Sequence, residues 1–367
     1  MRITFVLNHV NLNGGIRVIG IYAERLKKRG HTVTVVARPR PVVSLTNKLK
    51  SAVKGKGWPI DPNTLPDHFD NVDVDLRVIE SRRPIIDRDV PDADVVVATW
   101  WETAPWVANL SRSKGAKAYF VQDFGANVGQ PMDKLIETWR LPMHQIVISQ
   151  YISDLVKASV PEAEMSFVPN SVDLDQFRSA PRGKQPTPVA GTIYSPSHFK
   201  GTDIALAACE IARKTLPDLK LIGFGLQEKN KAELPPWASF RARVPDGELK
   251  NIYGACDVWL FPPRKEGYGL PILEAMACRT PVIATPAGAA PELINANGGG
   301  MLVPHENPAA MAAAIVKICQ LTDNEWRELS ASAYATVTDY SWDDATDRFE
   351  AALKHAAQQK PHSRLAV

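Results

Sequence analysis

Short apolar runs rich in Val and Ile alternate with helical patterns along the chain, and this alternation restricts the possible folds more than any other feature. Strands separated by helices are typical of parallel sheets. The runs are continuously apolar, which predicts strands buried on both faces. The strands predicted in the first half are 3–7, 32–37, 75–79, 95–99, 117–121, 145–149 and 165–168. Those predicted in the second half are 189–194, 219–223, 239–243, 257–261, 281–285 and 301–303.

A polar, proline-rich stretch, residues 179–188, divides this alternation into two sets and reads as a linker. The chain has 367 residues, which is too many for one ordinary domain and enough for two separate cores. We therefore predict an α/β fold of two doubly wound, Rossmann-like domains, residues 1–180 and 181–340, facing each other across a cleft. Residues 341–357 are predicted to form a terminal helix that packs back on the N-terminal domain, and residues 358–367 a disordered tail.

Polar and glycine-containing loops follow several predicted strands. Ligands of doubly wound sheets lie outside the carboxyl ends of the strands. The loops in question contain Gly14-Gly15, Trp100-Trp101-Glu102, Gln122-Asp123, His198-Phe199-Lys200 and Glu266 with the residues after it. Because all of them follow strands of one architecture, we expect them to converge on one ligand site.

The most informative of these loops runs from Glu266 to Glu274, with the sequence EGYGLPILE. Gly267 and Gly269 let a ligand approach the backbone closely, and Pro271 suits the first position of a helix predicted over 271–278. The amides at a helix amino end can hold a diphosphate, while carboxylates on either side can bind hydroxyl groups. A nucleotide-sugar needs both. The alternative is an ordinary glycine loop of a doubly wound fold, with Glu274 as a first-turn helix charge.

Charge and cysteine content exclude some other classes. The formal net charge is +3 and no arginine-rich segment occurs, so nucleic acid is not an expected partner. The four cysteines, all in the second half, form no close Cys-x-x-Cys pair, and buried reduced thiols are expected rather than zinc. No run approaches the ~18 apolar residues needed to span a bilayer, and the amino end reads as a first strand and not as a signal peptide. A cytoplasmic protein is the prediction.

With these residues in view, the chain resembles the GT-B glycosyltransferases of family GT4, retaining enzymes that take a sugar from a nucleotide-sugar. The resemblance spans nearly the whole chain and is most specific at Glu266 to Glu274, where the family carries two glutamates separated by seven residues. It continues at Gly14-Gly15, at Val168-Pro-Asn170-Ser-Val-Asp173, at Phe199-Lys200-Gly201 and at Ser341-Trp342.

The resemblance implies roles for these positions. Glu266 would hold the donor sugar and Glu274 the ribose, while Lys200 and the helix amides would hold the diphosphate. Glu266, Asp123 and Gln122 are the residues we assign to the reaction centre. The residues assigned to donor binding are Gly14, Gly15, Lys200, His198, Gly267, Tyr268, Gly269, Leu270 and Glu274.

The chain also departs from the family pattern. An arginine commonly precedes the diphosphate lysine, but here the strand end reads Thr192-Ile-Tyr-Ser195, so that this cation is missing or replaced by His198. A histidine often follows the strand that ends here at Val121, where this chain has Gln122-Asp123. The position after Cys278, usually glycine, is Arg279.

No metal or other cofactor is expected at the donor site. Asp-x-Asp spacings occur at 73/75, 92/94 and 173/175, and such pairs bind a divalent ion in another glycosyltransferase fold. Asp92 and Asp94 precede their strand, which is the wrong end for a ligand, and Asp173/Asp175 has no partner acid nearby in the sequence. Helix amides and Lys200 can neutralise the diphosphate without a metal.

The predicted function is a retaining transfer of a sugar from a nucleoside-diphosphate-sugar to a glycan or lipid-linked acceptor in cell-surface polysaccharide synthesis. A non-catalytic nucleotide-sugar-binding protein remains an alternative because of the missing arginine and histidine. A nicotinamide oxidoreductase is disfavoured, since Gly223-Phe-Gly225 and Gly14-Gly15 each lack part of a Gly-x-Gly-x-x-Gly fingerprint.

Residues 41–58 combine aliphatic side chains with four lysines, a pattern typical of reversible attachment to an anionic membrane surface, although a solvated insertion fits as well.

Overall fold

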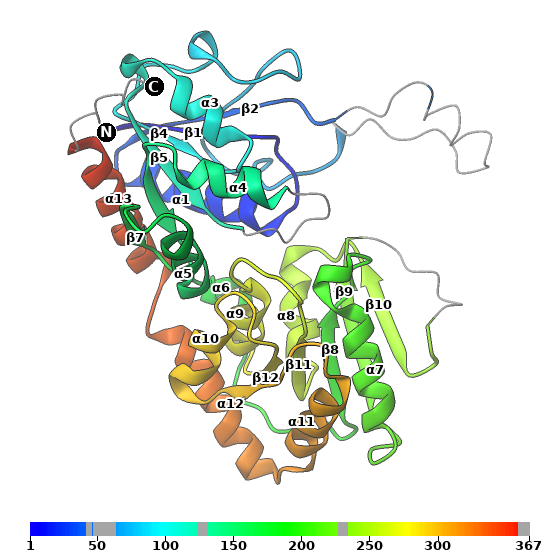
Figure 1. The fold of residues 1–367 in the computed structure, drawn as a ribbon. Helices are drawn as coiled ribbons and strands as arrows, with labels where there is room; N and C mark the ends of the chain where they lie inside the picture. The colour runs from blue at the N-terminus through cyan, green and yellow to red at the C-terminus, as the bar shows by residue number, and fades with distance from the viewer. Residues whose placement is uncertain (42–45, 47–63, 124–130, 227–233, 359–367) are drawn as a thin grey trace.

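The chain folds into two lobes, each built on a parallel sheet, as Figure 1 shows. The structure is a computed structural model, and it describes residues 1–41, 46, 64–123, 131–226 and 234–358. In the picture the N-terminal lobe lies above the C-terminal lobe, and the last helix returns to the upper one. Both sheets therefore lie at the centre of a lobe, with helices around them.

The N-terminal sheet has the strand order β3-β2-β1-β4-β5-β6-β7, with every neighbouring pair parallel. Its strands are β1 (Arg2–Leu7), β2 (Thr32–Ala37), β3 (Asp75–Val78), β4 (Val95–Ala98), β5 (Ala116–Val121), β6 (His144–Val147) and β7 (Met165–Phe167). The helical segments between them are α1 (Gly14–Lys28), η2 (Asp87–Asp89), α3 (Thr103–Asn109), η3 (Arg112–Lys114), α4 (Met132–Trp139) and α5 (Gln150–Ser159).

The C-terminal sheet has the order β10-β9-β8-β11-β12-β13 and is also parallel throughout. Its strands are β8 (Val189–Ile193), β9 (Lys220–Gly225), β10 (Ala238–Ala242), β11 (Val258–Phe261), β12 (Val282–Ala284) and β13 (Gly300–Leu302). Its helical segments are α6 (Leu174–Phe177), η4 (His198–Lys200), α7 (Thr202–Ala212), α8 (Asp246–Gly254), α9 (Leu270–Ala277), α10 (Ala290–Asn297), α11 (Pro308–Gln320) and α12 (Asp323–Thr338).

The α/β fold class is confirmed, and each predicted strand lies within a residue or two of an observed one. The prediction that the strands are buried on both faces is correct for the central ones, such as β4 and β11, whose residues are all buried. It is wrong for β3, a strand at the sheet edge that is mostly exposed. An edge strand has a neighbour on one side only, so its apolar residues do not imply complete burial.

The last helix, α13 (Trp342–Gln358), leaves the C-terminal lobe and packs against the N-terminal sheet. Its contacts are with α1, β4, β5 and β6. Phe349 is fully buried and stacks on Tyr22 at a centroid distance of 4.2 Å, and its ring meets the edge of Phe120 at 5.0 Å. The core of the N-terminal lobe is therefore completed by residues from the far end of the chain.

Two predicted segments lie outside the described residues. These are nearly all of the lysine-rich segment, residues 42–45 and 47–58, and the tail from residue 359. Arg38 and Arg40, which lie just before this lysine-rich segment, are buried. Among the described residues, none of the helices is both long and apolar enough to cross a membrane.

Candidate functional site

The amino end of α9 is held at the junction of the two lobes by its own glycine loop. Gly269 caps the helix with φ of 111°, a backbone conformation that favours glycine. The helix begins at Leu270, one residue before the predicted start, so Pro271 is its second residue. Gly267 lies so close to the N-terminal lobe that an added Cβ would stand 2.0 Å from the carbonyl oxygen of Gln122. Only glycine fits at this contact.

Lys200 and Glu266 form an ion pair at this loop, with the ammonium nitrogen 2.6 Å from the carboxylate oxygen. Lys200 ends η4, and the following Gly201 adopts φ of 68°, in contact with the carbonyl oxygen of Pro262. Burial acts to lower the pKa of Lys200, but the charges of Glu266 and then Asp123 outweigh it and hold the pKa above its ordinary value. The lysine is therefore a fixed cation beside the loop.

Predicted residues from the N-terminal lobe converge on the same place. An added Cβ at Gly15 would lie 3.5 Å from the Gln122 side chain, and one at Gly14 would lie 3.5 Å from Leu270 of the other lobe. Gly14 and Gly15 form the first turn of α1, so the amino ends of two helices, α1 and α9, approach each other here. The amide oxygen Oε1 of Gln122 is buried and has no hydrogen-bond partner among the described residues.

Further hydrogen bonds cross between the lobes around this point. Ser149, which caps α5, donates its hydroxyl to the carbonyl oxygen of Gly267 at 2.9 Å. The backbone amide of Gln150 donates to Glu292 of α10 at 2.8 Å. These contacts fix the register of the Glu266 loop against the carboxyl ends of the N-terminal strands.

Glu274, eight residues after Glu266, is buried and engaged at both oxygens. Arg17 of α1 donates to Oε1 at 3.0 Å, and the Tyr253 hydroxyl donates to Oε2 at 2.6 Å. Arg17 also donates to Gln176 at 2.7 Å. Burial raises the pKa of Glu274 above its ordinary value, although Arg17 and Tyr253 act in the opposite direction. Each carboxylate oxygen has more than one lone pair, so the group can still accept hydrogen bonds from ribose hydroxyls.

Of the predicted donor-site residues, Tyr268 has its side chain directed away from the loop, and His198 contributes a backbone contact. Tyr268 is buried, and its hydroxyl donates to the carbonyl oxygen of Asn170 at 2.7 Å, so only its backbone is left for a ligand. His198 is exposed, and its carbonyl oxygen accepts a hydrogen bond from Arg264 at 2.6 Å. Arg264 also pairs with Asp203 at 2.7 Å and with Glu306, so its charge is already matched on the C-terminal lobe.

Asp123 lies on the N-terminal side of the junction with two tryptophans. Trp100, Trp101, Gln122 and Asp123 line one small pocket, together with Tyr119. The tryptophans are half-buried. Asp123 is also close enough to Lys200 to influence its pKa. An acidic side chain and two aromatic side chains thus line one pocket, close to the ammonium group of Lys200.

A buried polar cluster lies at the carboxyl ends of β1, β2 and β4. Arg38 donates to the side chain of Asn8 and to Glu102, at 3.3 Å for the latter. Asn8 in turn donates to Glu102, and the Arg38 guanidinium lies 4.3 Å from the ring centre of Trp106. These charges position the strand-end loops of the N-terminal lobe and are compensated within it.

The acidic pairs found in the sequence have other partners. Asp73 pairs with Lys27, Asp75 with Arg77, Asp92 with Lys114 and Asp94 with Arg2. Asp173 caps α6 by accepting hydrogen bonds from the amides of Asp175 and Gln176.

The cysteines are free and buried, as predicted; they are Cys209, Cys256, Cys278 and Cys319. Burial raises the pKa of Cys209 to about 12.

Arg17 is the residue of this junction that sequence reasoning missed. It follows Gly15 by two residues, and it contacts a partner 257 positions away. One signal was available: Arg17 follows Gly14 by three residues, which places both on one face of α1, and α9 contains no lysine or arginine that could pair with Glu274.

In the comparison with protein families, residues 188–321 match the family described as Glycosyl transferases group 1. This segment includes Lys200, Glu266 and Glu274. It starts at β8 and ends just after α11, so it covers most of the C-terminal lobe.

Curated relatives and solved structures extend the similarity to the whole chain. Phosphatidyl-myo-inositol mannosyltransferase of Mycolicibacterium smegmatis is 26% identical over 339 residues, 87% of this chain and 84% of that protein. O-antigen chain mannosyltransferase B of Escherichia coli is 33% identical over 111 residues, 30% of this chain. For that protein and two D-inositol 3-phosphate glycosyltransferases, the matched segments span only 28 to 52% of the relative's length.

The structure of Anabaena HepE in complex with UDP and glucose superimposes with a TM-score of 0.72 at 16% identity, over 97% of this chain and all of that one. At this identity the likeness concerns the fold alone. The chain therefore has the GT-B fold, and its residues 188–321 match the family described as Glycosyl transferases group 1.

Proposed function

We propose that the protein transfers a sugar, with retention of configuration, from a nucleoside-diphosphate-sugar to a glycan or lipid-linked acceptor. One observation carries the proposal: the Lys200–Glu266 ion pair, at 2.6 Å, lies beside the glycine loop that opens α9, where Gly15 and Gln122 of the other lobe meet it. Such a place offers a cation and backbone amides for a diphosphate and a carboxylate for sugar hydroxyls.

Each residue then has a chemical part. The bond between the anomeric carbon and the phosphate oxygen breaks, and Lys200 with the amides of the α9 amino end stabilises the charge on the departing diphosphate. Glu266 orients the donor sugar through its hydroxyls. The acceptor oxygen forms the new bond on the same face, and its proton passes to the departing phosphate oxygen or to Asp123. Glu274 holds the ribose.

The N-terminal lobe would bind the acceptor. Asp123, Trp100 and Trp101 line one pocket at the carboxyl ends of its strands, beside the donor loops. Several relatives are named for acceptors that are glycans or lipids, including an O-antigen chain and phosphatidyl-myo-inositol. This naming supports a role in cell-surface polysaccharide or glycolipid synthesis.

Attachment to a membrane surface is a separate part of the proposal. It rests on the sequence of residues 41–58, in which four lysines accompany aliphatic side chains. Each lysine near anionic lipid contributes about 1 kcal/mol to binding. The test is sedimentation with anionic and neutral vesicles at low and high salt. Binding to anionic vesicles that is lost at high salt, and lost when the four lysines are replaced by glutamine, supports it; indifference to anionic lipid favours a soluble acceptor.

The function itself is tested by a thermal-shift panel of nucleoside diphosphates and nucleotide-sugars, followed by assays of hydrolysis and transfer. We expect one nucleotide to raise the melting temperature and its sugar derivative to be consumed. A non-catalytic binder, the second candidate because the family's arginine and histidine are missing, would show the shift but no consumption with any acceptor. Absence of any shift across the panel would argue against both.

A further inference from the structure

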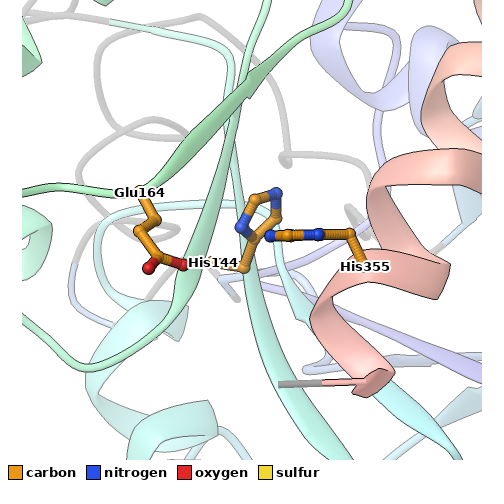
Figure 2. Close-up of side chains that lie close together, drawn as sticks. All are labelled: His144, Glu164 and His355. Carbon is orange, nitrogen blue, oxygen red and sulfur yellow. The ribbon is translucent and has the colours of Figure 1, made fainter.

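Three side chains capable of binding a metal meet at the amino end of the N-terminal sheet, far along the strands from the donor loops. His144 is the first residue of β6, Glu164 directly precedes β7, and His355 lies in the last turns of α13. One ligand atom from each lies within 4.8 Å of the other two. Figure 2 shows the three side chains directed towards one another from the two strands and the helix.

His144 already has the surroundings of a metal-binding histidine. It is 4% exposed, and its Nε2 lies 2.9 Å from the hydroxyl oxygen of Ser166. Its Nδ1 is buried and has no hydrogen-bond partner among the described residues. Histidines that bind metals usually present one nitrogen to the ion and have the other held by a hydrogen bond. If Nε2 donates to Ser166, the lone pair on Nδ1 is the one left for a ligand.

The protonation state of His144 agrees with this geometry. Burial, and secondly the neighbouring His355, lower its pKa to about 4. Burial disfavours the charged form of the ring, and the neutral form is the one that binds metals. An unpartnered buried nitrogen otherwise costs stability, and an ion at this position would satisfy it.

Glu164 and His355 complete the donor set and have room to adjust. Both are exposed, and the His355 ring lies 4.9 Å from that of His144 at an interplanar angle of 60°. Ligands placed 2.0 to 2.2 Å from a tetrahedral zinc ion lie roughly 3.4 Å apart. The present atoms lie within 4.8 Å of one another, so an approach of up to about 1.4 Å is needed, and rotation of the two exposed side chains can supply it. The carboxylate also offsets one charge of a divalent ion.

We propose that His144, Glu164 and His355 bind a divalent transition-metal ion, with Zn²⁺ as the best match, and that the ion fastens α13 to the N-terminal sheet. Two imidazoles and one carboxylate are an established donor set for zinc, and water can take the fourth position. The donor loops meet the other end of β6, where Ser149 contacts Gly267, so the ion has no part in the transfer reaction. Its effect would be on the attachment of the last helix.

The test uses the full chain without a histidine tag, stripped with a chelator and titrated with Zn²⁺ by calorimetry and by thermal denaturation. We expect one equivalent to bind and the melting temperature to rise. Co²⁺ in place of Zn²⁺ should give the visible absorption of a tetrahedral site. Nucleotide binding, measured in parallel, should be the same with and without the ion, which separates this outcome from that of the proposed function.

Variants locate the site. His355→Ala and Glu164→Gln change exposed side chains, so both should fold, and each should weaken binding by roughly tenfold or more and reduce the thermal shift. His305→Ala, an exposed histidine of the other lobe, is the matched control and should bind like the wild type. Wild-type affinity in His355→Ala, or no saturable binding of Zn²⁺ or Co²⁺ at submillimolar concentration, would overturn the proposal.

Discussion

Arg17 and Glu274 join the two lobes through a hydrogen-bonded ion pair of 3.0 Å between residues that are 257 positions apart. Both side chains are mostly buried, with exposures of 18% and 10%. The carboxylate that the family resemblance assigns to the ribose is therefore also the group that connects α9 to α1. On the proposed assignment, nucleotide binding and the contact between the lobes depend on the same residue, Glu274.

Replacing Arg17 by Met should lower the free energy of unfolding by about 1.5 to 3 kcal/mol at pH 8, because a buried charge-assisted hydrogen bond is lost. Burial already holds the pKa of Glu274 above its ordinary value, and loss of Arg17 raises it further. A carboxyl with a raised folded pKa stabilises the fold most below its unfolded pKa, and this contribution is lost as the pH rises through the folded pKa. The destabilisation should therefore be smaller near pH 5.

Denaturant unfolding at the two pH values measures this difference. Arg25→Met is the matched control, since Arg25 lies on the same helix and its pair with Asp343 is exposed on the carboxylate side. It should cost less and show little change between the two pH values. A cost for Arg17→Met that is equal at pH 5 and pH 8 would show that the pair does not depend on the ionisation of Glu274.

Lys200→Ala should weaken binding of the nucleoside diphosphate by roughly 1.5 to 3 kcal/mol, the range for a hydrogen bond to a charged group. Binding of the bare nucleoside, which lacks the phosphates, should change little and serves as the internal control. Calorimetric titration of the two ligands gives both values. Equal losses for nucleoside and nucleoside diphosphate would mean that Lys200 only supports the fold of the loop through Glu266.

Substitutions of Glu266 and Glu274 should have different effects on turnover and on nucleotide binding. Glu266→Gln should depress turnover more than nucleoside-diphosphate affinity, since Glu266 is assigned to the sugar. Glu274→Gln should mainly weaken nucleotide binding, since that residue is assigned to the ribose. Steady-state rates together with direct binding measurements distinguish the two effects. Small and equal effects from both substitutions would remove the assignment.

Gly267→Ala should reduce transfer by on the order of a hundredfold, because a Cβ at this position meets the Gln122 carbonyl oxygen at 2.0 Å and must displace the loop. Gly247→Ala is the control, since an added Cβ there meets nothing within 4 Å. Circular dichroism on both variants checks that the fold is retained. Wild-type activity in Gly267→Ala would mean that the contact between the loop and Gln122 is not needed for catalysis.

The ionisation of Glu350 should make the attachment of α13 partly sensitive to acid. Lys354, Arg29 and His31 surround it, and the hydrogen bond from Lys354 is the largest influence that lowers its pKa, to about 2. A depressed folded pKa gives stability that is present above the unfolded pKa and is lost as the pH falls from about 4.5 towards 2. Glu350→Gln should therefore cost about 1 kcal/mol at pH 7 and about a quarter of that at pH 2.5, where a carboxyl with a pKa of about 2 is still mostly ionised, as followed by denaturant unfolding.

Local pattern was enough to predict most of the fold. Strand positions follow from apolar runs, and a buried parallel strand such as β11 consists of little else. The exposure of β3 could not be foreseen, because the sequence of a strand does not state whether a neighbour lies on each side. The start of α9 shifted by one residue since Gly269 and not Leu270 takes the cap position.

At the candidate site, the sequence was enough to predict the chemistry within one loop, but it was not enough to predict the contacts between loops. The positions of Lys200 and Glu266 at strand ends predicted that they would be close, and their ion pair agrees with that expectation. The partners of Glu274 were missed because Arg17 lies in the other lobe, and His144 was missed because its neighbours come from a second strand and the last helix. Such pairings depend on tertiary packing, which periodicity does not encode.

The return of α13 to the first lobe has a consequence for synthesis on the ribosome. Phe349 and Leu353 belong to the same apolar cluster as Phe5, Tyr22 and Phe120, yet they are translated more than two hundred residues later. The aromatic surface of the nascent N-terminal lobe therefore stays uncovered until the entire second lobe has been synthesised. During this period, aggregation and chaperone binding compete with folding. A stop codon near residue 340 would remove less than a tenth of the chain and leave that surface permanently exposed.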